Sequence, residues 1–309
     1  MTRLAIDCGH GYVKGLGESG ARVLFPSLIC PAPASVDLGE FGTSEVITID
    51  GQPFLVGEPA RAHATPLWSR QKAGDPDTLR LILIAAAQLG AAGPITLATG
   101  LPLSWFGSQK KAFREALLGY GATIQLPEKP AQRIWIESVK VLPQGLAAAA
   151  GIILHPDREP GDYAVVDIGY RTSDFVVVAK SSTGKIQFDP AMAGSLELGT
   201  HAIAAEIAKG LEHDYHVPFQ AAEVEEKARL HVEGQAVELA GRRATATEAI
   251  GHQLHEALAE KLDQKLSKLA GIVLVGGGAV VLGHAFPQAV VMEEAQWANA
   301  GAYLAAGQS

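Results

Sequence analysis

Two short turns that place an aspartate beside glycines are the segments of this chain best suited to phosphate chemistry. The first runs from Asp7 to Lys14 and reads Asp-Cys-Gly-His-Gly-Tyr-Val-Lys; the second runs from Asp167 to Asp174 and reads Asp-Ile-Gly-Tyr-Arg-Thr-Ser-Asp. Each turn follows a short apolar strand and leads into another, and its glycines allow backbone amides to face phosphate oxygens. We interpret Asp7 and Asp167 as candidate ligands of a metal ion. The two turns together predict two halves of the chain that bind one nucleotide.

Length and composition favour a globular protein with two domains. The chain has 309 residues, of which 48% are hydrophobic and 19% are charged. This mixture is typical of a folded protein, and the length usually exceeds one simple domain. The formal net charge of -8 argues against direct nucleic-acid binding, because phosphate neutralisation requires a basic surface.

The cysteine content and the apolar segments indicate a cytoplasmic protein without a membrane span. Only Cys8 and Cys30 occur, and the opening residues lead into a strand without a signal-peptide pattern. The longest apolar stretch, residues 81–98, is broken by Gly90, Gly93 and Pro94. Cys8 has no partner at metal-ligand spacing, and neither does His10, so we expect neither to bind a metal directly.

The elements that must position the two turns form a repeated pattern. Three strands open the chain and three more follow residue 160, at 4–7, 13–16, 21–25, 163–167, 174–179 and 185–188. Between them we predict a hairpin at 46–49 and 53–56, helices at 78–89, 109–118 and 145–153, and strands at 95–99, 122–125 and 133–141. The second half continues with helices at 196–211, 220–230, 247–269 and 296–305 and a strand at 272–275. The pattern predicts a duplicated α/β protein, whose halves cross at the proline-interrupted segment 155–162.

An ordered series of motifs resembles the actin and sugar-kinase superfamily, and within it the ParM/StbA group of bacterial and archaeal actin-like ATPases. Besides the two turns, the series contains residues 25–28 (Phe-Pro-Ser-Leu), 55–58, 99–102 (Thr-Gly-Leu-Pro), 142–146, 194–199, 274–278 and 294–301. The resemblance implies an actin-like, ribonuclease H-like duplicated fold with a nucleotide cleft between two domains. It implies domain I at 1–160, with an inserted small subdomain at about 26–75 and the C-terminal helix 294–309 packing back on it. Domain II would span 161–293, with a small subdomain at about 195–270.

The resemblance also implies ATP, with GTP as the alternative, together with Mg²⁺ as cofactor, and it assigns roles to individual residues. Lys14 would place positive charge on the β- and γ-phosphates. Asp7 and Asp167 would be catalytic and would bind Mg²⁺ largely through its waters. Gln144 would orient the attacking water, because a glutamine cannot act as the general base that sugar kinases supply with an aspartate.

The predicted nucleotide contacts come from five places in the chain. They are Gly9, His10, Gly11, Tyr12 and Lys14; Gly169, Tyr170, Arg171 and Thr172; Gly194 and Ser195; Glu223 and Lys227; and Gly276, Gly277 and Gly278. The residues that compete as candidates for contacting the base are Glu223, Glu226, Lys227 and Arg229. The three glycines are candidates for close approach to the nucleoside. Tyr170 stands where relatives usually have a second glycine.

The resemblance favours a filament-forming ATPase for plasmid segregation or cytoskeletal positioning. Its expected partners are further copies of itself and a DNA-binding adaptor, since an acidic chain needs a basic intermediary to hold DNA. Two alternatives stay open: a monomeric regulatory or chaperone-type ATPase, and a small-molecule phosphotransferase.

Overall fold

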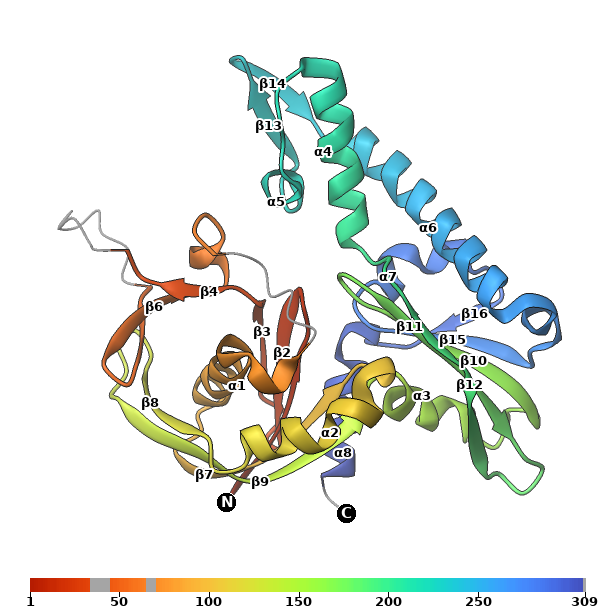
Figure 1. Ribbon diagram of the computed structural model, residues 1–309, viewed down its shortest axis with the longest axis horizontal. Coiled ribbons are helices and arrows are strands. Elements are labelled where there is room, and N and C mark those ends of the chain that lie inside the picture. The colour runs from red at the N-terminus through yellow and green to blue at the C-terminus, as the bar shows by residue number, and fades with distance from the viewer. Residues whose placement is uncertain (34–44, 65–70, 308–309) are drawn as a thin grey trace. The chain divides into compact units, whose positions relative to one another are not determined.

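The computed structural model describes residues 1–33, 45–64 and 71–307, and the chain divides into two compact units (Figure 1). Unit 1 comprises Met1–Ala148 and Asn299–Ser309, and unit 2 comprises Ala149–Ala298. The chain therefore passes from one unit to the other inside helix α3 (Leu146–Ile153), ahead of the segment 155–162, and returns at the start of helix α8 (Ala298–Ala306). Part of the expected subdomain at 26–75, residues 34–44 and 65–70, lies outside the described residues.

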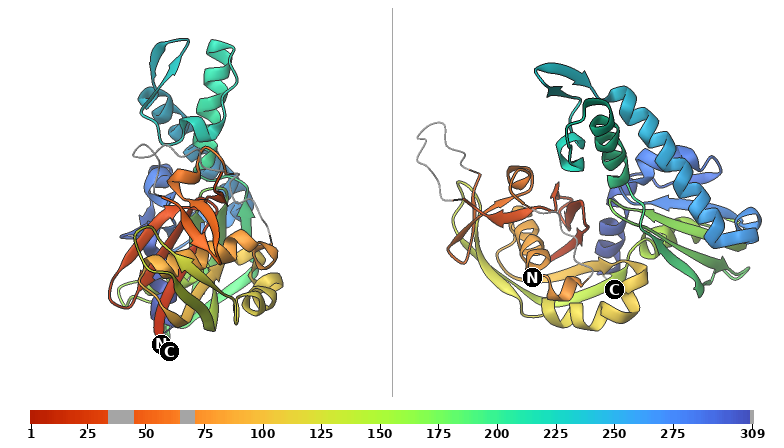
Figure 2. Two further views of the ribbon diagram at one scale, coloured as in Figure 1. Left: turned by 90° about the vertical axis from the view of Figure 1, so that its left-hand side faces the viewer. Right: turned by 45° about the horizontal axis from the view of Figure 1, so that its top comes forward.

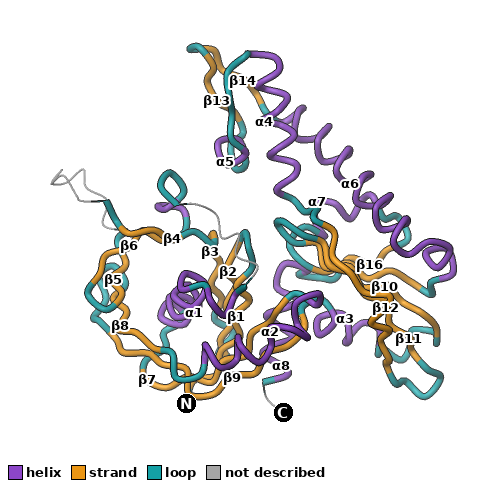
Figure 3. Tube along the Cα trace, in the orientation of Figure 1, coloured by secondary structure: helices purple, strands orange, loops and turns teal. Residues whose placement is uncertain are grey.

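Unit 1 is built on a mixed, curled sheet with the strand order β3-β2-β1-β7-β9-β8-β5-β6-β4. Its strands are β1 (Thr2–Cys8), β2 (Tyr12–Gly17), β3 (Arg22–Pro26), β4 (Ile29–Pro31), β5 (Ile47–Ile49), β6 (Gln52–Val56), β7 (Gly93–Leu101), β8 (Gly121–Gln125) and β9 (Gln132–Pro143). Helix α1 (Pro76–Gln88) lies inside the curve of the sheet and packs on β1, β2, β8 and β9 (Figure 3). Helix α2 (Leu103–Leu117) packs on β7 and β9.

The sequence explains where α1 starts and ends. Asp75 is its N-cap and accepts a hydrogen bond from the backbone amide of Asp77 at 3.2 Å, and Pro76 occupies the first helical position. The residues from 81 to 87 are buried, and Gly90, with a φ of 82°, follows the last turn. The predicted helix at 78–89 is confirmed. Its apolar residues lie on all sides of the helix and not on one face only, so the helix is buried in the core of unit 1.

Unit 2 repeats the opening topology of unit 1. Its sheet has the order β12-β11-β10-β15-β16, formed by β10 (Gly161–Ile168), β11 (Ser173–Lys180), β12 (Ile186–Leu196), β15 (Gly271–Val275) and β16 (Ala289–Val291). As in β3-β2-β1-β7-β9, an antiparallel meander is followed by two parallel pairings. The predicted duplication is therefore confirmed at the level of topology.

The helices of unit 2 extend its core away from the sheet. Helix α4 (His201–Tyr215) leads from the sheet towards the hairpin formed by β13 (Arg229–Val232) and β14 (Gln235–Glu238), and helix α6 (Ala240–Leu262) leads back from the hairpin beside α4 (Figure 2). Ile250, Leu254, Leu258 and Leu262 are spaced four residues apart, and all four are buried along one face of α6. Two short helices, α5 (Ala221–Val224) and α7 (Ala279–Leu282), complete the unit. Among the described residues, no helix is long and apolar enough to cross a membrane.

The helix predicted at 220–230 is wrong. Only residues 221–224 are helical, and the chain then enters the β13–β14 hairpin. Glu233 and Gly234 both have positive φ, 49° and 81°, which is the conformation of a type I′ hairpin turn. Leu230, Val232 and Val237 are buried, so their period-two spacing overrides the helical propensity of the preceding charged residues.

Candidate functional site

Loop 1, residues 9–11 between β1 and β2, lies beside three of the predicted site residues. Asp7 and Lys14 are cross-strand partners, and the Lys14 Nζ lies 3.3 Å from the Asp7 Oδ2. The other carboxylate oxygen, Oδ1, accepts a hydrogen bond from the Gln144 Nε2 at 2.7 Å. Asp7 is only 2% exposed, so this buried carboxylate is held between a cation and an amide.

The carbonyl groups of loop 1 are held by donors from other parts of unit 1. The Ser27 hydroxyl donates to the Gly9 carbonyl at 2.7 Å, and the Ser27 amide donates to the Gly11 carbonyl at 2.9 Å. The buried Lys72 ammonium donates to the Cys8 carbonyl. Because each peptide group is planar and trans, the amides of His10 and Tyr12 point away from Ser27. This orientation is the one that an anion-binding loop requires.

The side chains of Cys8 and His10 have packing roles. Burial raises the pKa of the Cys8 thiol to about 12, so it stays protonated and is a poor metal ligand. The His10 ring packs edge-on against Trp105 of α2, with the ring centroids 5.7 Å apart. Within the described part of the chain, no group of three or more His, Cys, Asp or Glu side chains could hold a metal ion.

Gln144 is fixed in place by the ends of β7 and α8. The backbone amide of Gln144 donates to the Leu101 carbonyl at 2.9 Å, and the backbone amide of the next residue, Gly145, donates to the Asn299 Oδ1 at 2.8 Å. The Thr99 hydroxyl donates to the Ile6 carbonyl at 2.7 Å, which joins β7 to β1 just before Asp7. The motif at 99–102 therefore has a structural reason, because it aligns the Gln144 backbone with the strand that carries Asp7.

Loop 2, residues 169–172 between β10 and β11, is held by the start of α4. The amides of Thr200 and His201 donate to the carbonyls of Gly169 and Tyr170 at 3.2 and 2.8 Å. An added Cβ on Gly199 would lie 2.6 Å from the Tyr170 carbonyl oxygen, so this close approach requires glycine. By the same planarity argument, the loop amides that follow these carbonyls point away from α4.

The Tyr170 side chain points towards α5. Its hydroxyl lies 3.2 Å from the Glu225 Oε2, to which it donates, and 2.9 Å from the His201 Nδ1. The His201 ring packs at a tilt against the Tyr170 ring. Burial lowers the pKa of His201, Glu225 raises it and Arg171 lowers it further. The Thr172 hydroxyl donates to the Asp174 Oδ2 at 3.5 Å.

The glycine triplet lies directly against β10. An added Cβ on Gly276, which has a φ of 85°, would overlap the Asp167 Oδ1 and lie 2.5 Å from the Ile168 carbonyl oxygen. The Gly278 amide donates to the same carbonyl at 2.8 Å. Gly277 is less restricted, because the nearest atom to an added Cβ is 3.7 Å away. The structure therefore brings the triplet beside Asp167, and two of its glycines have a packing reason.

The other predicted contacts lie on two further segments of unit 2. Ser195 on β12 pairs with Asp174 of β11, and Gly194 packs against the Phe175 ring. Glu223 is exposed and accepts a hydrogen bond from the Gln220 amide in a capping box at 2.6 Å, while Lys227 is exposed just after α5.

Sequence reasoning missed Ser27, Lys72 and Asn299 as site-supporting residues. Ser27 belongs to the Phe-Pro-Ser-Leu motif at 25–28. Its hydrogen bond to loop 1 depends on the end of β3 lying beside that loop, which the motif alone does not indicate. Lys72 has no local signal at all.

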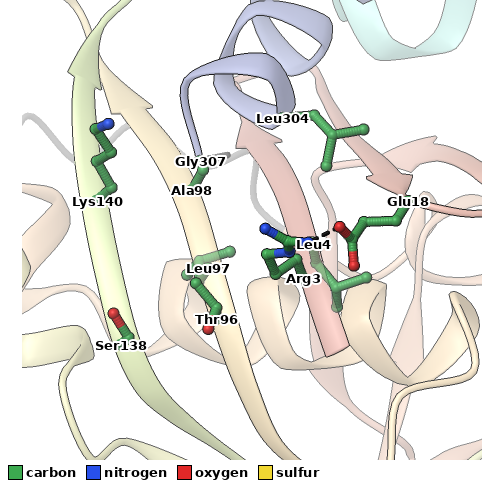
Figure 4. Close-up of a pocket in the computed structure, with 10 residues that line it drawn as sticks. All are labelled: Arg3, Leu4, Glu18, Thr96, Leu97, Ala98, Ser138, Lys140, Leu304 and Gly307. Atoms are coloured by element: carbon green, nitrogen blue, oxygen red, sulfur yellow. Dashed lines mark ion pairs between the residues drawn. The ribbon is translucent and has the colours of Figure 1, made fainter. Parts of the chain in front are cut away.

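A small hollow of about 150 Å³ in unit 1 lies away from these residues (Figure 4). It is lined by Arg3, Leu4, Glu18, Thr96, Leu97, Ala98, Ser138, Lys140, Leu304 and Gly307, and contains none of the predicted site residues. Its rim carries an exposed ion pair between Arg3 and Glu18 at 2.7 Å.

Comparison with protein families finds an actin-like model for each part of the chain. The family described as "Actin like proteins N terminal domain" matches residues 5–146, and "Archaeal actin homologue MreB-like, C-terminal" matches residues 165–288. An archaeal actin homolog from Thermoplasma acidophilum is 26% identical over 339 aligned residues, which cover 100% of this chain and 99% of that protein. A Thermoplasma volcanium homolog is 25% identical over the same share of each.

Solved structures of actin-like proteins share the fold over almost the whole chain. The archaeal actin homolog Ta0583 in complex with ADP has a TM-score of 0.83 at 22% identity, covering 100% of this chain and 99% of that one. A 15-stranded ParM filament from Clostridium botulinum has a TM-score of 0.84 at 21% identity, covering 99% of each chain. The two family models, the relatives and the shared two-domain α/β fold agree, and the chain is an actin-like protein.

Proposed function

We propose that this chain is an ATPase that binds Mg-ATP with loops 1 and 2 and assembles into nucleotide-dependent filaments. The observation that carries the proposal is the group formed by Asp7, Lys14 and Gln144 beside a loop whose carbonyls are turned inward. This group offers a cation, a carboxylate and an amide next to amides oriented for an anion. An ADP complex of an archaeal actin homolog with the same fold supports a nucleotide as the ligand. We also propose functional domains at 1–160 and 161–293, whose limits differ from those of the compact units because most of α3 and the first residue of α8 belong to unit 2, which runs from Ala149 to Ala298.

The residues present fit a magnesium ion that arrives with the phosphates. Mg²⁺ commonly keeps several of its waters and uses one or two protein carboxylates together with phosphate oxygens. Asp7 and Asp167 occupy equivalent positions at the ends of β1 and β10, the two strands that lead into the loops. A cage built from protein side chains alone has no counterpart among the described residues. The ion would neutralise charge that develops on the transferred phosphoryl group.

Gln144 is placed to orient water. Its Nε2 is committed to Asp7, which leaves the Oε1 as a hydrogen-bond acceptor for a water hydrogen. An amide cannot take up the proton, so the site favours slow hydrolysis over transfer to an alcohol. A phosphotransferase would need a base in this position.

Filament formation follows from an open, head-to-tail contact repeated between copies. The structural likeness to a ParM filament supports this assembly. We further propose a cytoplasmic role in plasmid segregation or cytoskeletal positioning, with a DNA-binding adaptor, because the net charge of -8 disfavours direct DNA contact.

The assembly test is light scattering and pelleting with ATP and Mg²⁺, followed by electron microscopy. We expect filaments with ATP and their loss after hydrolysis, and GTP in a parallel sample decides the base preference. A chain that binds and hydrolyses ATP but stays monomeric at all concentrations would support the regulatory ATPase instead.

The site test compares Asp7→Asn and Asp167→Asn with Asp157→Asn as a matched control. Asp157 has a side chain that is 89% exposed and lies outside both loops. We expect both site variants to weaken Mg-ATP binding by at least tenfold, because each loses a charge next to the ion, while the control binds as the wild type does. Undiminished affinity in both site variants would contradict the metal role.

A further inference from the structure

A cluster of three side chains joins loop 2 to the segment that follows α4 in the chain. Tyr170 comes from the loop, His201 from the first turn of α4, and Glu225 from the residue after α5. The Tyr170 hydroxyl donates to the Glu225 carboxylate and accepts from the protonated Nδ1 of a neutral His201, so one hydroxyl satisfies both partners. All three side chains are partly buried.

The segment reached by this cluster, residues 220–228, is the α5 segment and carries Glu223 and Lys227, two of the candidates for contacting the base. Glu223 and Lys227 flank Glu225 at two residues on either side. On its other side the segment is held by α6, because the Arg243 guanidinium donates to the carbonyls of Val224 and Lys227 at 2.8 and 3.0 Å. The α5 segment is therefore tied to α6 through its backbone and to loop 2 through a side chain.

We propose that Tyr170, His201 and Glu225 are positioning residues that hold the α5 segment in register with loop 2, so that the base and phosphate contacts form together. The inference rests on the proposed function and deepens it. The start of α4 holds the Tyr170 backbone, and the rigid Tyr170 ring carries the hydroxyl to Glu225, so the position of the α5 segment depends on that of loop 2. In turn, an α5 segment displaced from its place would remove a hydrogen bond from loop 2.

The test compares Tyr170→Phe with Tyr163→Phe. The control removes one hydroxyl from the same unit, since the buried Tyr163 donates to the Glu159 carbonyl at 2.7 Å, far along β10 from loop 2. Calorimetry measures the affinity of each variant for Mg-ATP and for Mg-tripolyphosphate. Tripolyphosphate has the phosphates of ATP but lacks the base. We expect Tyr170→Phe to bind ATP about threefold to tenfold more weakly, the effect of losing the hydrogen bond that joins the α5 segment to loop 2, and tripolyphosphate within about twofold of the wild type. Tyr163→Phe should bind both as the wild type does.

Two further measurements separate positioning from a general loss of structure. Glu225→Ala should weaken ATP binding to the same degree, and adding it to Tyr170→Phe should cost nothing more, because each substitution removes the same Tyr170–Glu225 hydrogen bond. Without ligand, amide exchange of residues 221–228 should be faster in Tyr170→Phe than in Tyr163→Phe.

The inference is overturned by unchanged ATP affinity in Tyr170→Phe, by equal losses for both ligands, by additive effects of the two substitutions, or by unaltered exchange in the α5 segment. A wild-type chain that binds neither ligand gives a different pattern, which refutes the proposed nucleotide site and the inference with it.

Discussion

Gly100 in β7 is a position where one added methyl group should be very costly. A Cβ built there overlaps the Tyr303 hydroxyl and Cζ and lies 3.0 Å from its Cε2. Tyr303 belongs to α8, is fully buried, and packs from the C-terminal end of the chain onto the strand that aligns Gln144. The Gly100→Ala variant must therefore displace the Tyr303 ring, because the β7 backbone cannot move without breaking its hydrogen bonds to β1 and β9.

The magnitude follows from the area of the displaced ring. A buried tyrosine covers roughly 150–250 Å², which at about 25 cal/mol per Å² corresponds to roughly 4 to 6 kcal/mol as an upper bound. Partial repacking reduces this, so we expect Gly100→Ala to lower the free energy of unfolding by about 3 kcal/mol or more.

Urea unfolding followed by tryptophan fluorescence measures this change, with Gly107→Ala as the matched control. Gly107 lies within α2 and has no atom within 4 Å of an added Cβ, so alanine there should raise stability by about 0.5–1 kcal/mol. In the double variant Gly100→Ala/Tyr303→Ala the first substitution should cost little beyond the second, because the clash is gone. A Gly100→Ala variant within about 1 kcal/mol of the wild type, or strictly additive effects, would refute the reasoning.

Three other predictions concern single groups. In Gln144→Ala, nucleotide should still bind while phosphate release slows by a factor on the order of ten to a thousand, because the water loses its acceptor; unchanged turnover would remove Gln144 from the mechanism. In the native protein at pH 8, a thiol reagent should modify the partly exposed Cys30 and spare Cys8, whose pKa of about 12 and burial protect it, and mass spectrometry should show both labelled only after unfolding. Burial lowers the pKa of His201 in the folded state, so as the pH falls the unfolded chain takes up the proton before the folded chain does. The free energy of unfolding should therefore fall as the pH drops below 6.5. Urea midpoints measured across this range should fall less in His201→Asn than in the wild type. An identical pH slope in that variant would contradict the assignment.

Several elements could be predicted because their signals are local. The hairpins that carry both loops follow from short apolar strands separated by glycine-containing turns, and α1 follows from its cap and its apolar run. The repeated strand pattern predicted the duplication, which both sheets show. The helix predicted at 220–230 is wrong for the opposite reason. Its charged residues favour a helix locally, whereas the buried face of the β13–β14 hairpin is defined by packing against the rest of unit 2.

Within the candidate site, the sequence indicated Asp7, Lys14 and Gln144 as individual residues but not the contacts between them. Asp7 and Lys14 are neighbours on one hairpin, so their pairing follows from the register of two adjacent strands. The bond between Gln144 and Asp7 spans 137 positions, and no periodicity or turn chemistry reports such a distance. It depends on the order of the sheet, in which β7 lies between β1 and β9.

The sequence by itself determined the two aspartate-glycine loops, the strands that support them and the repeat that relates them, because backbone propensity and side-chain periodicity act over a few residues. Only the tertiary structure decided which groups orient those loops. Lys72 reaches the Cys8 carbonyl from 64 positions away, and the Tyr170 hydroxyl finds Glu225 55 positions away. A buried donor must find an acceptor wherever packing supplies one, so such partners are set by the assembled core and not by the local sequence.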